Sequence, residues 1–151
     1  LTAAEVTAED MQFATLDPTM RKIKLPSGRV AILTATVGIV SNLPTHLVAA
    51  FRATLEEVVE ADIVVHVRDI AHPDSEAQAE DVIRILKDLA VEDDADHVLI
   101  EALNKMDLLP GDSRREILGR TAYGKSAVAL SALTGAGVES LLRLVERPAF
   151  P

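Results

Sequence analysis

Short apolar runs alternate with amphipathic stretches over most of the second half of the chain. Residues 63–67 and 97–103 are mainly apolar, which is typical of strands that are buried on both faces of a sheet. Between them, apolar side chains recur every three or four residues from Ala79 to Leu89, which predicts a helix with one buried face. A short helix, a strand and a second helix are predicted over 113–118, 126–130 and 138–146. This order predicts an α/β fold with a mainly parallel sheet and helices on both of its faces.

The first third of the chain has a different pattern. Residues 22–25 alternate between basic and apolar side chains, and residues 26–28 (Pro-Ser-Gly) supply turn chemistry before a second apolar run over 29–33. We therefore expect an antiparallel hairpin in this segment. Asn42 then marks the start of a helix that is predicted to extend to about Val59, because apolar residues recur there at helical spacing.

Composition limits the functions that this fold can have. The 151 residues suit one domain, and the formal charge of −9 argues against sequence-independent binding of nucleic acid, which depends on Lys and Arg. The chain has no cysteine, which excludes disulfides and thiolate chemistry, and no stretch long enough to cross a membrane. We therefore expect a cytoplasmic protein without membrane contact. The basic cluster is interpreted as the solvated face of the hairpin, with a local patch for nucleic acid as the alternative, and consists of Arg21, Lys22, Lys24 and Arg29.

Candidate chemistry gathers where the predicted strands end. In α/β sheets ligands bind beyond the carboxyl ends of the strands. Four short polar segments occupy those ends here: 35–38, 68–69, 104–107 and 131–133. A binding site is therefore expected at this edge of the sheet.

The segment Asn104-Lys105-Met106-Asp107 has the chemistry to recognise guanine. The Asp107 carboxylate can accept hydrogen bonds from both N1–H and the exocyclic amine of guanine, a donor pair that adenine lacks. The stem of Lys105 would cover the base plane, and Asn104 would either contact the opposite edge of the base or connect neighbouring loops. Because Asn, Lys and Asp are also common turn residues, a purely structural role is the alternative. A second loop after the next strand favours the guanine hypothesis and consists of Ser131, Ala132 and Leu133.

Further segments make the chain resemble the G domain of the HflX family of translational GTPases over nearly its whole length. They are residues 13–19, 41–57, 66–69 and 71–74, of which the Asn-Leu-Pro-Thr-His-Leu run at 42–47 is the most distinctive. The resemblance implies a single partial Ras-like P-loop GTPase domain over 1–151. Its first-switch region lies in 1–21, its sheet and helices in 22–147 and a tail in 148–151. It also implies GTP and GDP as ligands and the ribosome as a partner.

The resemblance assigns roles to two switch segments. Thr15 matches the first-switch threonine that helps to coordinate Mg²⁺, and Gly38 matches the second-switch glycine whose N–H contacts the γ-phosphate. The remaining nucleotide-binding residues that it implies in these segments are Phe13, Ala14, Leu16, Asp17, Thr36 and Val37.

Two departures from the family pattern bear on activity. The chain contains no Gly-x-x-x-x-Gly-Lys-Ser/Thr phosphate loop, and the second-switch Asp of the family is Ala35 here. Each charge-assisted hydrogen bond of a phosphate loop contributes about 1.5–3 kcal/mol, so the loss of three weakens nucleotide binding roughly a thousandfold. We therefore expect a truncated domain that hydrolyses little or no GTP. The alternative is a pseudo-GTPase that serves as a protein-interaction module without turnover.

The family places a central strand between the strands predicted at 29–33 and 63–67, and that strand is also missing. Either these two strands pair directly, or the chain is part of a longer protein. The other polar residues are given structural roles. His66 is interpreted as a satisfied core histidine, and Asp62 and Asp69 as caps or turn formers at the ends of a strand.

Overall fold

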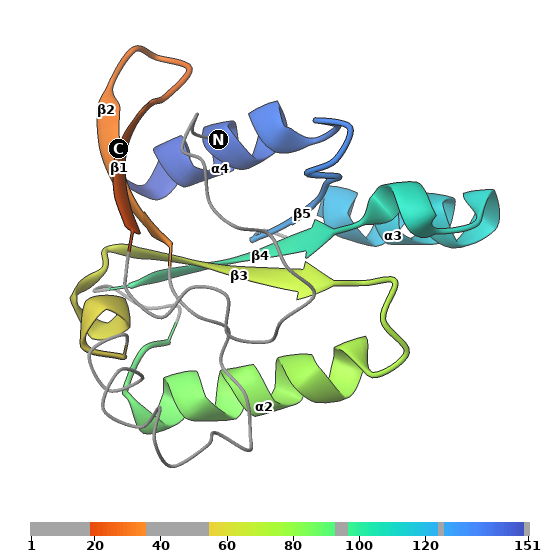
Figure 1. Cartoon of the computed structure of the whole chain (residues 1–151), viewed down its shortest axis with the longest axis horizontal. Coiled ribbons are helices and arrows are strands. Elements are labelled where there is room, and N and C mark those ends of the chain that lie inside the picture. The colour runs from red at the N-terminus through yellow and green to blue at the C-terminus, as the bar shows by residue number, and fades with distance from the viewer. Residues whose placement is uncertain (1–18, 36–54, 93–96, 124–125, 150–151) are drawn as a thin grey trace.

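The computed structural model describes residues 19–35, 55–92, 97–123 and 126–149, and their strands form two separate sheets (Figure 1). The first sheet is an antiparallel hairpin of β1 (Thr19–Lys24) and β2 (Val30–Ala35). Its turn is closed by the hydrogen bond from the Leu25 N–H to the Arg29 carbonyl, and Gly28 supplies the left-handed conformation with φ of 90°. The predicted hairpin is confirmed.

The second sheet is parallel and has the strand order β3-β4-β5. It contains β3 (Ile63–Asp69), β4 (Val98–Asn104) and β5 (Ala127–Ala129). Each strand lies within two residues of its predicted bounds. Within the described residues β2 pairs only with β1, and β3 pairs only with β4. The alternative in which the hairpin strand pairs directly with β3 is therefore wrong.

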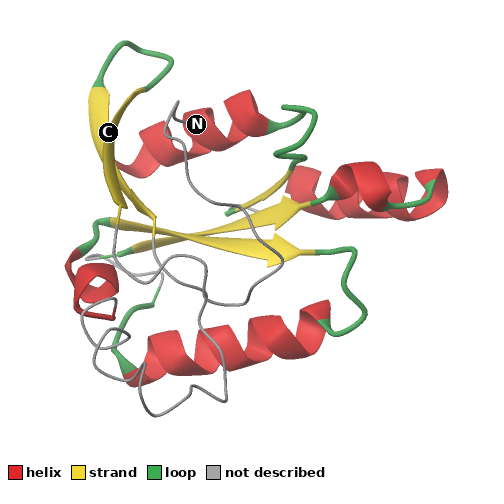
Figure 2. Cartoon of the chain, in the orientation of Figure 1, coloured by secondary structure: helices red, strands yellow, loops and turns green. Residues whose placement is uncertain are grey.

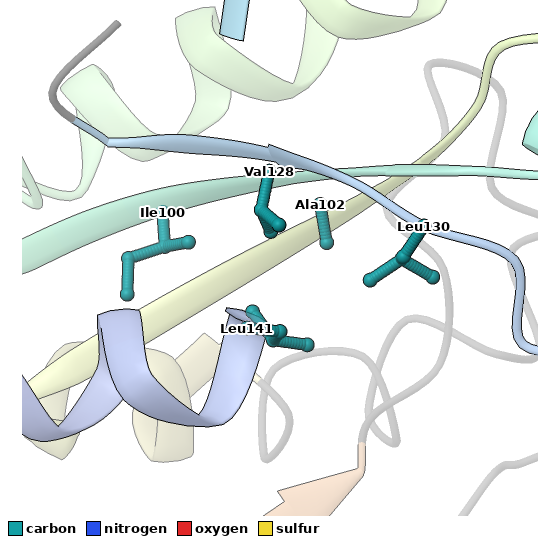
Figure 3. Close-up of a cluster of buried hydrophobic side chains, with 5 residues drawn as sticks. All are labelled: Ile100, Ala102, Val128, Leu130 and Leu141. Carbon is teal, nitrogen blue, oxygen red and sulfur yellow. The ribbon is translucent and has the colours of Figure 1, made fainter. Parts of the chain in front are cut away.

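Helices cover both faces of the parallel sheet (Figures 1 and 2). Helix α4 (Val138–Ala149) packs on one face through Leu141, which contacts side chains of β4 and β5. Figure 3 shows Ile100, Ala102, Val128 and Leu130 directed toward this helix. On the opposite face α2 (Ser75–Asp88) packs through Val82 and Leu86 against β3 and β4, together with Val58 of the helical residues 55–60. The predicted fold with helices on both faces is confirmed.

Helix α3 (Gly111–Tyr123) follows a 3₁₀ turn, η2 (Met106–Leu108), and lies beside β5 at the edge of the sheet. The predicted helix over 113–118 is too short at both ends. Most of the side chains described for α3 are exposed, so the helix has no broad apolar stripe that would reveal its length in the sequence. Of the helix predicted over 42–59, residues 55–59 are helical in the structure, and residues 42–54 lie outside the described residues.

The hairpin is attached to the rest of the molecule through one face and its turn. Ile23 and Leu25 are buried, and the N–H and hydroxyl of Ser27 in the turn both donate to the Glu146 carboxylate of α4. The opposite face is exposed and carries apolar and basic side chains side by side, since Lys24 lies across from Val30 and Lys22 across from Ile32. The four residues of the basic cluster are exposed, as predicted, but they do not share one face, because the register places Arg21 on the same face as Ile23.

Candidate functional site

Three strand ends and their loops meet at one edge of the parallel sheet. The register places Asp69 of β3 beside Asn104 of β4, and Leu103 of β4 beside Ala129 of β5. Backbone bonds extend this ladder into the loops, because the Ile70 N–H donates to the Asn104 carbonyl at 3.2 Å. The Met106 N–H likewise donates to the carbonyl of Leu130 at 3.2 Å. The two segments that are predicted to contact guanine, 104–107 and 131–133, are therefore neighbours in space.

Asn104 connects these two segments through its side chain. Its amide oxygen Oδ1 accepts a hydrogen bond from the backbone N–H of Ala132 at 2.9 Å. Of the two roles that the sequence left open for Asn104, the contact between loops is the one present in this structure. A fixed spacing between the segments is needed if both are to contact one flat base.

Asp107 is oriented by the second loop. Its Oδ1 accepts a hydrogen bond from the Ser131 hydroxyl at 2.6 Å, and Ser131 is only 1% exposed. The same hydroxyl oxygen accepts the backbone N–H of Thr134 at 3.2 Å, which fixes the direction in which the hydroxyl donates. A carboxylate has about four lone-pair positions, so one bond to Ser131 leaves capacity for two further donors from a ligand.

Lys105 has a backbone conformation that is uncommon for a residue with a side chain. Its φ is 70°, in the left-handed region, and its ammonium Nζ lies 2.6 Å from Oδ2 of Asp69. The Asp69 Oδ1 accepts the backbone N–H of Ala71 at 3.1 Å. Burial would raise the pKa of Asp69, but the hydrogen bond and charge of Lys105 and the Ala71 N–H hold it below its usual range. Asp69 is therefore more than a turn former, and the sequence interpretation missed its bond to Lys105.

Arg114 of α3 bonds to the backbone of the loop that follows β4, a role that the sequence interpretation also missed. Its Nε donates to the Met106 carbonyl at 3.1 Å. Its terminal nitrogen donates to the carbonyls of Asp107 at 3.3 Å and Leu109 at 3.2 Å. These bonds satisfy carbonyl groups in and just after the 3₁₀ turn, which overlaps the end of segment 104–107. One arginine in an exposed helix gives no signal of this role in the sequence.

Gly137 closes the loop that follows β5. Its φ is 78°, and a Cβ atom at this position would lie 2.2 Å from the Ala129 carbonyl oxygen and 3.0 Å from the Leu130 Cα. Only glycine therefore allows the loop to return against β5. The Ser131 N–H donates to the Ala136 carbonyl at 2.8 Å, which keeps Ser131 and its hydroxyl in place. The sequence signal for this turn was the pair of glycines between a strand and a helix, and it was not used.

Arg68 precedes Asp69 in β3 and contacts the first residues of α2. Its guanidinium contacts Glu101 at 2.8 Å, Glu76 at 3.0 Å and the Ser75 hydroxyl at 3.3 Å. Burial would lower the pKa of Arg68, but these carboxylates raise it. Arg68 therefore ties the start of α2 to β3 and β4, and with it the loop between Asp69 and Ser75.

The interpretation of His66 as a satisfied histidine is wrong at one atom. Within the described part of the chain, its buried Nδ1 has no hydrogen-bond partner. Burial lowers the pKa of His66, the carboxylate of Glu101 opposes this, and Arg68 adds to it. A neutral ring carries no charge, so an unpaired nitrogen in it costs much less to bury than an unpaired charged group would. This explains how the unsatisfied Nδ1 is tolerated.

The remaining predicted site residues divide into two groups. Ala132 and Leu133 are exposed within the second loop, with Leu133 at 85%. The first-switch residues Phe13, Ala14, Thr15, Leu16 and Asp17 and the second-switch residues Thr36, Val37 and Gly38 lie outside the described residues. The described residues contain no group of three His, Asp or Glu side chains that could hold a metal ion. Among the described helices, none is both long and apolar enough to cross a membrane.

Solved structures of other proteins share this fold. A crystal structure of SsGBP with GDP matches with a TM-score of 0.66 and 24% identity, and the match covers 86% of this chain and 41% of that one. A crystal structure of Era with MgGDPNP and part of 16S ribosomal RNA matches with a TM-score of 0.64 and 20% identity. That match covers 94% of this chain and 47% of Era. At these identities the likeness establishes the fold.

Sequence comparison identifies the family. The chain is 45% identical over 147 residues to the GTPase HflX of Magnetococcus marinus, which covers 97% of this chain and 33% of that protein. It is 43% identical to the GTPase HflX of Caldanaerobacter subterraneus, over 99% of this chain and 32% of that protein. The chain thus spans about a third of the length of these curated relatives. The family model described as 50S ribosome-binding GTPase matches residues 1–105. The HflX resemblance is therefore confirmed, and the chain belongs to the family of 50S ribosome-binding GTPases.

Proposed function

We propose that this chain binds the base of guanine nucleotides between segments 104–107 and 131–133, as the GTP-binding domain of an HflX-like ribosome-associated GTPase. The observation that carries the proposal is the orientation of Asp107. Its carboxylate is held by the buried Ser131 hydroxyl at 2.6 Å, while Asn104 holds the second loop at 2.9 Å. A site whose acceptor is fixed before the ligand arrives loses less entropy on binding.

The chemistry of Asp107 selects guanine over adenine. N1–H and the exocyclic amine of guanine are parallel donors, and one carboxylate can accept both. Adenine presents an acceptor at N1 and no exocyclic donor on C2, so the carboxylate would be left unpaired against it. A bidentate contact of this kind contributes about 1–3 kcal/mol of discrimination, or roughly fivefold to 150-fold in affinity.

Hydrolysis requires more than the base site, and we propose that these 151 residues alone turn over little or no GTP. These residues include no Gly-x-x-x-x-Gly-Lys-Ser/Thr motif, and residue 35, where the family has Asp, is an alanine, which has no side-chain oxygen to bind a metal ion. The other residues expected to act near Mg²⁺, such as Thr15, lie outside the described part. The described residues include no cluster of three His, Asp or Glu side chains, so a role for Mg²⁺ in this chain stays a prediction.

The ribosome is proposed as the assembly on which the whole protein acts. The support is the description of the matching family as ribosome-binding, together with the HflX relatives. The charge of −9 argues against a sequence-independent grip on RNA by this chain, so we expect other parts of the protein to supply most of the ribosome contact. We propose the cytoplasm as the location of this function. Among the described residues, no specific contact favours the alternative of a protein-interaction module without nucleotide.

A nucleotide titration tests the base site. GMP carries the guanine with a single phosphate, so it measures base recognition with little contribution from phosphate contacts. We expect millimolar GMP to shift the backbone NMR signals of 104–107 and 131–133, and AMP to leave them unchanged. Asp107→Asn should abolish the GMP response and favour XMP, because an amide can donate to the C2 oxygen of xanthine.

The matched control is Asp112→Asn, the same change at an exposed carboxylate in the first turn of α3. It should leave the GMP response intact. If GMP at several millimolar shifts no signal in either segment, base recognition by this chain is refuted. Phosphate release from GTP is measured separately, and clear turnover by the 151-residue chain would refute the proposed impairment while leaving the base site standing.

A further inference from the structure

We propose that Asp69 is a positioning residue of the guanine site, which acts by holding the side chain of Lys105 across the place of the base. This inference rests on the proposed function. It adds the end of β3 as a third part of the site, next to the two loops that follow β4 and β5. Asp69 contacts no ligand in this proposal, because its effect passes through Lys105.

The parallel register brings Asp69 to this place. Asp69 is the last residue of β3 and lies directly beside Asn104, the last residue of β4. Lys105 is the next residue of the chain, so its ammonium can reach back across the edge of the sheet. The distance from its Nζ to Asp69 Oδ2 is 2.6 Å, which is a short charge-assisted contact.

Lys105 needs such an anchor for two reasons. Its backbone is left-handed, with φ of 70°, a conformation that a side chain disfavours and that surrounding contacts must maintain. Its four-carbon stem is also flexible and half-exposed, so it samples many rotamers in water unless the ammonium is held. An ammonium fixed at Asp69 leaves the apolar stem stretched along the site, where it can cover a flat base.

The two oxygens of Asp69 have separate functions, which makes the inference testable. Oδ1 accepts the N–H of Ala71 and shapes the loop, whereas Oδ2 contacts Lys105. Asp69→Asn keeps an oxygen for Ala71 and replaces the charged oxygen with an amide. The variant therefore removes the ion pair and retains the turn. A residue that served only as a turn former would tolerate this change.

The experiment is a GMP titration of the 151-residue chain, followed by NMR. Asp69→Asn should weaken GMP binding about threefold to fivefold, the range for a partly exposed ion pair. The matched control is Asp62→Asn, the same substitution just before the other end of β3, where the carboxylate is exposed. It should leave the affinity unchanged. The thermal midpoint of both variants should stay close to that of the original chain.

A double-mutant cycle separates positioning from general damage. Lys105→Met keeps the apolar stem and removes the ammonium, so it should weaken GMP binding by about the same factor. If Asp69 acts through Lys105, Asp69→Asn should cause no further loss in the Lys105→Met chain. The loss caused by Asp69→Asn should also shrink at high salt, because screening weakens the original pair.

Each outcome has one meaning. A loss of affinity for Asp69→Asn that is absent in the Lys105→Met chain supports the inference. Unchanged affinity in Asp69→Asn, or equal losses in both backgrounds, overturns it while GMP binding by the original chain keeps the proposed function. Failure of the original chain to bind GMP refutes the proposed function and removes this inference with it.

Discussion

The parallel sheet and the hairpin show two ways in which strands are held in one molecule. Ile100 in β4 and Ile32 in β2 are the same residue type in the two sheets, yet Ile100 is 1% exposed and Ile32 is 69% exposed. The parallel strands lie between α2 and α4, whereas the hairpin is covered on one face only. A two-stranded hairpin is marginal in water, so its order depends on the few contacts that attach it.

This difference corresponds to a difference in the candidate site. The parallel sheet positions its loops by strand register, core packing and side-chain bonds at the same time. In the hairpin, Ile23 and Leu25 are buried, and among the described residues Ser27 bonds to Glu146 of α4. The proposed base site therefore lies in the well-supported part of the chain, and we expect perturbations of the hairpin to leave it largely intact.

The largest contrast is expected from one substitution made in both sheets. Ile100→Ala should lower the free energy of unfolding by about 2–5 kcal/mol, because it opens a cavity between β4 and α4. Ile32→Ala removes an exposed side chain and should cost less than about 1 kcal/mol. Urea unfolding followed by circular dichroism measures both. Similar losses would mean that the hairpin is as well packed as the parallel sheet.

The next effect separates steric clash from backbone strain in the loop after β5. Gly137→Ala would place a Cβ 2.2 Å from the Ala129 carbonyl oxygen, so the loop must move, at a cost of about 1–3 kcal/mol. Gly135 is the matched control, since its φ of 84° is similar and a Cβ there would meet nothing within 4 Å. Gly135→Ala should cost about 1 kcal/mol through strain alone. Only Gly137→Ala should also disturb the NMR signals of 131–133, and equal responses would refute the clash.

The order of elements could be predicted because each parallel strand is a short apolar run with polar residues at its end. The segment 104–107 was found for the same reason, since its residue types and its place after a strand are visible in the sequence. The length of α3 was not, because an exposed helix has little apolar periodicity. The sequence also left open whether β2 pairs directly with β3, because strand pairing depends on contacts that a sequence pattern does not specify; the structure shows that it does not.

The supporting residues of the site were harder to predict than its loops. Asp69 resembles many aspartates that end a strand, and its bond to Lys105 follows only from the register that places it beside Asn104. Arg114 acts on backbone carbonyls, which leave no trace in the sequence. These residues contribute through geometry between distant segments, so their roles require the fold.

A smaller effect is expected at the attachment of the hairpin. Ser27→Ala removes the hydroxyl that donates to Glu146 and should lower the free energy of unfolding by about 0.5–1 kcal/mol, since the contact is exposed. Amide hydrogen exchange should become faster within 20–24 and 30–34, while 98–104 keep their protection. Ser140→Ala, at an exposed position of α4, is the control and should change neither region. Equal acceleration in both sheets would show that the hairpin and the parallel sheet open as one unit.

The smallest effect is a pH dependence that belongs to the parallel sheet alone, because the hairpin contains no histidine. Burial lowers the pKa of His66 in the folded chain, Arg68 lowers it further and Glu101 partly offsets this. Below the ordinary histidine pKa of about 6.5 the unfolded chain binds a proton that the folded chain resists. The stabilisation is therefore complete above that pH and declines as the pH falls from there through the folded pKa. His66→Phe should reduce this decline between about pH 7.5 and 5.5 in urea unfolding, whereas His72→Phe, at an exposed loop position, should preserve it. The same decline in the His66→Phe chain would assign the dependence to another group.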